Sequence, residues 1–300
     1  AIPCGCPIDG IFIFGSCLTE RSDVQLTHFL RSARRTLHEI GILLLLVGCA
    51  GSQAQRIDDE ARRFGFVRQV IVGNEFHHVV YFNNVSRQSE TLHVYLEGDG
   101  SPWLRERFVS RDPTPRHPVM LRLMALDTHP SLYLGRPCYH GLANQPGCEP
   151  KFWTSGRYSQ PVVDNMAAAL ERVLDKHHKL AFFGFSGGGA LAMLLAERFP
   201  QTRSVVTIAG NLDPDAWVKF HGYSPLWTSL NPAHRPPLNP RIQQIHLAGE
   251  RDKNIPPAII RSALSHQVNA QIDIISNFDH LCCWHRLWPS VLASLIPQDS

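Results

Sequence analysis

The sequence predicts an α/β protein in which a mostly parallel β-sheet is covered by helices on both faces. From residue 66 onward, short apolar runs typical of buried strands alternate with longer patterns at helical spacing. One such run, residues 180–183, leads directly into a serine flanked by glycines and then into a helical pattern. The 300 residues are 44% hydrophobic and 18% charged, which is enough apolar material for the core of one large domain.

The predicted elements follow one another in a regular order. Two β-branched and aromatic runs, 67–72 and 76–82, are separated by Gly73-Asn74-Glu75, which predicts a hairpin. Beyond it we expect strands at 91–96, 131–134, 179–183, 203–209, 242–248 and 271–275, and helices at 118–127, from an N-cap at Ser159 onward, and at 187–199, 256–266 and 281–295. Residues 211–240, with six prolines and several aromatic side chains, interrupt this alternation.

The stretch Gly184-Phe185-Ser186-Gly187-Gly188 matches the G-x-S-x-G pattern of a nucleophile elbow. In that motif a serine lies on a strained turn between a strand and a helix, where a Cβ at the glycine positions would clash. The pattern alone is weak because glycine is common, but here an apolar strand precedes it and a helical pattern follows it. Ser186 is therefore the candidate nucleophile.

A serine hydroxyl needs a general base, and the base needs a carboxylate to orient it. In the elbow arrangement the acid and the histidine follow the serine in that order, each after a later strand. Asp252 lies where the chain leaves strand 242–248, with Glu250 and Asp213 as alternatives. His280 follows the last strand directly, whereas His285 falls inside a helical pattern, so we assign the base to His280.

Acyl transfer also needs hydrogen-bond donors where negative charge develops. The backbone N–H of Gly187, directly after the serine, is one expected donor. The loop Glu97-Gly98-Asp99-Gly100 follows strand 91–96 and supplies the other, with the N–H of Asp99 preferred and that of Gly100 second. We expect the carboxylates of Glu97 and Asp99 to face away from the site, because negative charge there would oppose an oxyanion.

These residues together resemble the α/β-hydrolase fold of serine hydrolases, over residues 66–300. The resemblance implies an eight-stranded, mostly parallel sheet with the active site at its C-terminal edge, and a short cap formed by the insertion 211–240. It implies an esterase- or lipase-like enzyme acting on small acyl substrates through an acyl-enzyme. One departure is Glu97, where many members carry histidine. A peptidase or acyltransferase with the same triad, or a non-catalytic binding protein with this fold, are the alternatives.

The N-terminal region has a different pattern. Arginines between 27 and 39 precede a short apolar run, 40–47, that ends in Leu46-Val47-Gly48-Cys49. This resembles a bacterial lipoprotein signal, and implies lipidation of Cys49 and a location in the cell envelope, facing the periplasm at the outer membrane. We therefore expect residues 1–48 to be an N-terminal extension and signal, and 49–65 to be a flexible tether; a buried helix at 40–47 is the alternative.

The cysteines and the net charge indicate which disulfides, metal ions and macromolecular partners to expect. Cys138 and Cys148 bracket a loop rich in Gly, Pro and Asn, and we expect a disulfide between them; Cys282 and Cys283 could pair or stay reduced. We expect no metal site, since C-x-x-C spacing is absent, and no cofactor. A net charge of +3 without a dense basic patch argues against nucleic acid as a partner.

Overall fold

The computed structural model describes residues 51–85, 89–105, 107–174 and 179–295. The chain divides into two compact units, Ala1–Gly51 and Ser52–Ser300, and the described residues belong almost entirely to the second. The predicted signal and Cys49 lie outside the described residues. In the described part, no helix combines the length and the apolar character needed to cross a bilayer.

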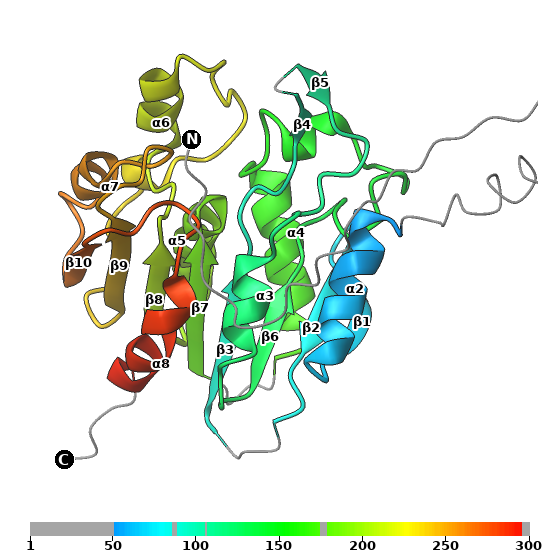
Figure 1. Cartoon of the computed structure of the whole chain (residues 1–300), viewed down its shortest axis with the longest axis horizontal. Helices are drawn as coiled ribbons and strands as arrows, with labels where there is room; N and C mark the ends of the chain where they lie inside the picture. The colour runs from blue at the N-terminus through cyan, green and yellow to red at the C-terminus, as the bar shows by residue number, and fades with distance from the viewer. Residues whose placement is uncertain (1–50, 86–88, 106, 175–178, 296–300) are drawn as a thin grey trace, which may run out of the picture. The chain divides into compact units, whose positions relative to one another are not determined.

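An eight-stranded sheet forms the centre of Ser52–Ser300 (Figure 1). The strands lie in the order β1-β2-β6-β3-β7-β8-β9-β10. Strand β2 is antiparallel to both of its neighbours, and the remaining pairs are parallel. Their bounds are β1 Val67–Val72, β2 His77–Phe82, β3 Thr91–Leu96, β6 Ser131–Leu134, β7 Lys179–Phe185, β8 Thr202–Ile208, β9 Gln243–Gly249 and β10 Ala270–Ile275. The predicted mostly parallel sheet of eight strands is confirmed.

Helices cover both faces of the sheet because side chains alternate across each strand. In β3, Leu92 and Val94 belong to a core shared with α4 (Gln160–Glu171), α5 (Gly187–Arg198) and α7 (Pro257–Ala263). Tyr95 belongs to the opposite core, shared with α2 (Gln53–Arg63), α3 (Val119–Met124) and α8 (Trp284–Ser294). Figure 1 shows α2, α3 and α8 on the near side of the strands.

The tether predicted for residues 49–65 is wrong over most of its length. Residues Gln53–Arg63 form α2, which begins with a capping box in which Ser52 and Gln55 satisfy each other's backbone N–H groups. Ala54, Ile57 and Ala61 recur at helical spacing and are buried. The polar composition that suggested a tether belongs to the solvent face of this helix.

The insertion 211–240 lies between β8 and β9, as predicted, and contains α6 (Pro214–His221) and a 3-10 turn, Pro232–His234. A second 3-10 turn spans Pro150–Trp153. A short hairpin of β4 (Trp103–Leu104) and β5 (Phe108–Val109) follows β3 and was not predicted. It is too short to show a period in the sequence.

Two local predictions concern Ser159 and the cysteines. Ser159 is the N-cap residue of α4, but its side chain makes no capping hydrogen bond.

Cys138 and Cys148 have Cα atoms 5.6 Å apart and sulfur atoms within bonding distance, as the predicted disulfide requires. The sulfur atoms of the adjacent Cys282 and Cys283 also lie within bonding distance.

Candidate active site

Ser186 lies on a sharp turn between β7 and α5, with a positive φ of 51° and ψ of −121°. Its N–H donates to the carbonyl of Ile208, 2.9 Å away, and its own carbonyl accepts from Asn211 at 2.8 Å. A Cβ on Gly184 would lie 2.2 Å from the carbonyl oxygen of Gly188. The turn therefore needs glycine where the strand and the helix approach each other.

The fold brings Ser186, His280 and Asp252 together from three loops at the C-terminal ends of β7, β10 and β9. The Nε2 atom of His280 lies 3.1 Å from Ser186 Oγ, and its Nδ1 atom lies 2.8 Å from Asp252 Oδ2. The side chain of Asp252 is fully buried. Its other oxygen accepts the N–H groups of Asn254 and Ile255, each at 2.8 Å, which fixes the carboxylate in place.

The alternative acids take other places. Glu250 is exposed and accepts the N–H of Asn277 at 3.0 Å. Asp213 caps α6 by accepting from the N–H of Ala216. His285 lies within α8. Among these candidates, only Asp252 and His280 form a hydrogen-bonded chain to Ser186.

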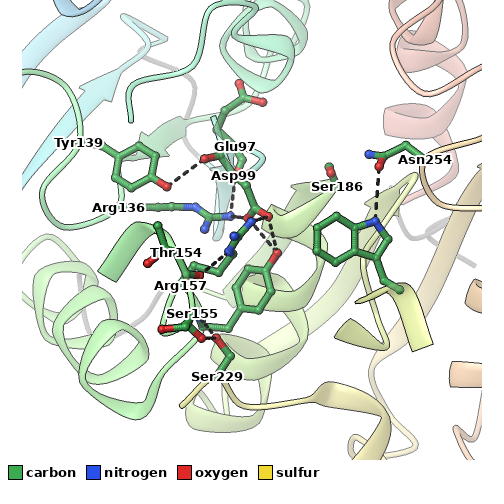
Figure 2. A network of polar contacts seen from close by, with 12 residues as sticks. Glu97, Asp99, Arg136, Tyr139, Thr154, Ser155, Arg157, Ser186, Ser229 and Asn254 are labelled. Atoms are coloured by element: carbon green, nitrogen blue, oxygen red, sulfur yellow. Dashed lines mark hydrogen bonds and ion pairs between the residues drawn. The ribbon is translucent and has the colours of Figure 1, made fainter. Parts of the chain in front are cut away.

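Two further side chains lie next to His280, and no sequence pattern assigned either of them to the site. The Nδ2 atom of Asn254 lies 3.0 Å from His280 Nε2. The indole N–H of Trp217 donates to Oδ1 of the same amide at 3.4 Å (Figure 2). Trp217 comes from the insertion, so this segment contacts the machinery of the site as well as covering it.

The loop after β3 lies directly against the elbow. A Cβ on Gly98 would come 3.3 Å from the Cβ of Ser186, and one on Gly188 would come 2.1 Å from the carbonyl oxygen of Leu96. Neither the N–H of Gly187 nor that of Asp99 donates a hydrogen bond to another described residue. Within the described part of the chain, both expected donors are thus without a protein acceptor.

The expectation that the Asp99 carboxylate faces away from the site is wrong. A Cβ on Gly187 would lie 1.9 Å from Asp99 Oδ1, so the carboxylate is adjacent to that glycine. Figure 2 shows the reason: two arginines converge on it. Arg157 Nη1 lies 2.7 Å from Oδ2 and Arg136 Nη2 lies 3.0 Å from Oδ1, and the Tyr158 hydroxyl donates to the same group at 2.8 Å.

The arginines determine the charge state of Asp99. Burial alone would raise the pKa of Asp99, but Arg157 and Arg136 together lower it below its usual range. Arg136 is itself almost completely buried, and its guanidinium lies 5.5 Å from the ring centroid of Tyr158. Asp99 is therefore an ionised carboxylate in a compensated cluster.

Glu97 is the second buried carboxyl of this loop. Its oxygens accept the N–H groups of Gly98 at 3.1 Å and of Met120 at 2.9 Å. Burial raises its pKa to about 7, against the smaller opposing effect of these hydrogen bonds. Glu97 thus ties the start of the loop to the N-terminus of α3.

A cavity of about 790 Å³ opens beside Ser186 and His280. Its walls come from the loop after β3, from residues 115–117 and 154–157, and from the insertion. Most of the lining is apolar, and the insertion contributes Trp217, Tyr223, Leu226 and Trp227. Such a cavity suits an apolar group attached to a polar reacting centre.

Two clusters in the described part of the chain have side chains close enough to share a metal ion. One is His93, Asp127 and His129, and the other is Asp213, Asp215 and His234. In the first, Asp127 already accepts from Tyr95 at 2.7 Å and pairs with both imidazoles. Neither cluster contains a residue of the Ser186 site, and the expected absence of a metal stays a prediction.

This chain resembles known proteins in its fold and not in its sequence. No protein-family model matches the chain, and no curated protein matches it either. Among solved structures, a bacterial membrane phospholipase A has a TM-score of 0.55 at 15% identity, covering 89% of this chain and 98% of that one. A proline iminopeptidase from Mycobacterium smegmatis has a TM-score of 0.57 at 12% identity, covering 76% and 97%. An esterase from Pyrococcus furiosus has 0.53 at 12% identity, covering 78% and 92%.

Proposed function

From the α/β-hydrolase fold that the chain shares with these solved structures, we propose that it is a serine hydrolase cleaving carboxylic esters through an acyl-enzyme. The observation that carries the proposal is the hydrogen-bonded chain from Ser186 through His280 to the buried Asp252 at the wall of an apolar cavity. A general base within hydrogen-bond reach of a hydroxyl on a strained turn is the arrangement that acyl transfer requires.

In the proposed reaction, Ser186 Oγ attacks the ester carbonyl carbon while its proton passes to His280 Nε2. Asp252 accepts the Nδ1–H of His280, and so orients the ring and stabilises its positive charge. The N–H groups of Gly187 and Asp99 stabilise the oxyanion. The proton on Nε2 then goes to the departing alkoxide, which leaves as the alcohol, and a water molecule activated in the same way releases the acid.

The lining of the cavity favours an apolar acyl group. Trp217 and Leu226 of the insertion pack against the core and also line this space beside Ser186. An ester carbonyl at Ser186 would leave its acyl chain among Trp217, Leu226 and Trp227. We therefore expect activity to rise with acyl chain length in a series of p-nitrophenyl esters, up to the limit that the cavity accepts.

A fluorophosphonate probe tests the nucleophile. We expect the wild type to be labelled and Ser186→Ala to be unlabelled. Hydrolysis should fall by roughly 10⁴-fold or more in Ser186→Ala, and by about 10⁴-fold in Asp252→Asn, where the histidine loses its orienting anion. Glu250→Gln is the matched control, because its carboxylate lies outside the hydrogen-bonded chain and activity should be retained.

Labelling of Ser186→Ala equal to that of the wild type would refute the assignment. Peptide and thioester substrates run beside the esters separate the ester hydrolase from a peptidase or acyltransferase with the same residues. A correctly folded wild type that neither reacts with the probe nor turns over any of these substrates would favour a binding protein.

We also propose that the chain is a bacterial lipoprotein, attached through Cys49 in the cell envelope and facing the periplasm at the outer membrane. The support is the basic segment before the apolar run 40–47 and the sequence Leu46-Val47-Gly48-Cys49. A disulfide between Cys138 and Cys148 is compatible with an oxidising compartment.

A further inference from the structure

Large hydrophobic side chains are exposed around the cavity. They come from three separate parts of the chain, the β4–β5 hairpin, the insertion and the segment after β10. The set, here called the rim, comprises Trp103, Leu104, Phe108, Val109, Phe220, Tyr223, Trp227 and Leu281. Trp227 is 80% exposed and Phe108 is 66% exposed. Soluble proteins rarely leave so many large apolar groups together in water unless something binds there.

Half of the rim lies at the cavity itself. Four of its members, Trp103, Tyr223, Trp227 and Leu281, both line the cavity and are exposed to solvent. Figure 1 shows β4, β5 and α6 beyond the same end of the sheet. A partner covering the rim would therefore face the cavity directly.

The hairpin combines these apolar groups with positive charge. Residues 103–111 contain three arginines and a single acid. Arg105, Arg107 and Arg111 are exposed, next to the exposed Trp103 and Phe108. Aromatic and aliphatic side chains with arginines beside them are the combination that inserts into the headgroup region of a membrane bearing negative charge.

We propose that the rim docks on an anionic phospholipid surface, with the β4–β5 hairpin entering the interface. The charge of the hairpin favours this occupant over a neutral apolar partner. Docking places the cavity entrance at the lipid, so an ester-bearing lipid reaches Ser186 without crossing water. The inference rests on the proposed hydrolase for that last step, but the docking itself does not require catalysis.

The test is binding of the full chain to vesicles of phosphatidylcholine alone and of phosphatidylcholine with phosphatidylglycerol. All proteins carry Ser186→Ala, to prevent turnover, and Cys49→Ala, to remove the proposed lipid acceptor, so residues 1–50 contribute equally to each. The hairpin variant is Arg107→Ser with Phe108→Ser. We expect its partitioning onto anionic vesicles to fall about tenfold, because one cationic and one apolar contact are lost.

The chain offers a matched control in Arg63→Ser with Phe64→Ser. This is also an exposed Arg-Phe pair, and it lies just before the start of β1, at the opposite end of the sheet from the cavity. Binding of the control should equal that of the parent protein. Binding of the hairpin variant equal to the parent, an equal loss in both variants, or no preference for anionic vesicles would each overturn the proposal.

Activity measurements separate this inference from the proposed function. With Ser186 and Cys49 restored, Arg107→Ser with Phe108→Ser should hydrolyse a dissolved ester within about twofold of the wild type, since both positions lie on the surface outside the cavity lining. Hydrolysis of an ester embedded in anionic vesicles should fall with binding. Vesicle binding without probe labelling would refute the hydrolase alone, and labelling without anionic binding would refute the docking alone.

Discussion

Asp99 shows how a buried negative charge can lie beside a site that must stabilise an oxyanion. A lone carboxylate beside Gly187 would oppose that oxyanion, but this one is paired with two guanidinium groups, so the three groups together carry a formal charge of +1. The two guanidinium groups therefore compensate the carboxylate, which is not an isolated negative charge next to Gly187. Arg157 holds the side chain of Asp99 in place, and the N–H of Asp99 is the proposed second oxyanion donor.

The raised pKa of Glu97 predicts how the stability of the fold depends on pH. Burial raises this pKa from an ordinary value of 4.5 to about 7 in the folded protein, so the free energy of unfolding is highest below pH 4.5 and falls as the pH rises from 4.5 through 7, where the buried group must ionise. Relative to Glu97→Gln, which cannot ionise, the wild type should lose up to about 1.4 kcal/mol of unfolding free energy per pH unit across that window. Urea unfolding of the wild type and of Glu97→Gln at pH 5 and pH 7.5 measures the difference between their free energies of unfolding. A difference that is the same at both pH values would contradict the raised pKa of Glu97.

Because Gln53–Arg63 form α2, the folded domain includes residues that the sequence predicted to be a flexible tether. The apolar stripe of α2 packs on the same face of the sheet as α3 and α8. The side chain of Gln53, at the first turn, donates to the carbonyl of Pro115 at 2.9 Å, and Pro115 lines the cavity. The first turn of α2 therefore lies beside a loop of the candidate site.

Truncation of Ile57 tests whether α2 belongs to the domain. Ile57 is 1% exposed, so Ile57→Ala should lower the free energy of unfolding by about 2–5 kcal/mol through lost burial and the cavity left behind. Arg56→Ala is the control on the exposed side of the same helix and should change it by about 0.5 kcal/mol or less. Urea denaturation distinguishes the two; an Ile57→Ala variant as stable as the control would mean that this segment is a tether after all.

Across the whole molecule, the candidate site, the insertion and the hairpin all lie at the C-terminal edge of one sheet. Parallel strands send their connecting loops to that edge, so residues far apart in sequence meet there. The proposed acyl anchor and the proposed docking of the rim would be two separate membrane signals, and stable attachment to membranes generally requires two.

Expression in a Gram-negative host tests the anchor. Processing before Cys49 should give a protein whose intact mass corresponds to a chain starting at that cysteine with acyl groups attached, and palmitate should label it. Cys17→Ala is expected to behave like the wild type, while Cys49→Ala should lose the label. An unlabelled wild type that keeps residues 1–48 would remove the lipoprotein proposal.

The eight strands of the main sheet, five of the helices that connect them and the strand–serine–helix turn at Ser186 could be predicted from the sequence, because buried strands, helical periodicity and glycine requirements are local properties. Asp252 and His280 could also be predicted, since each follows a strand whose end meets the same edge of the sheet. Asn254, in the loop before α7, carries no such signature, and neither do Arg136 and Arg157.

The polar groups that surround the reacting atoms could be identified only from tertiary contacts. Arg136 and Arg157 reach Asp99 from segments that have no pattern linking them to it, and their pairing depends on side chains buried by the folding of the whole sheet. The same holds for α2, whose short apolar stripe shows as a core face only once the sheet is present to cover it. Turns, strands and helical periodicity depend on neighbouring residues, so the sequence alone predicts them. The compensation of a buried charge and the burial of a helix face depend on contacts between residues far apart in the sequence, so only the tertiary structure shows them.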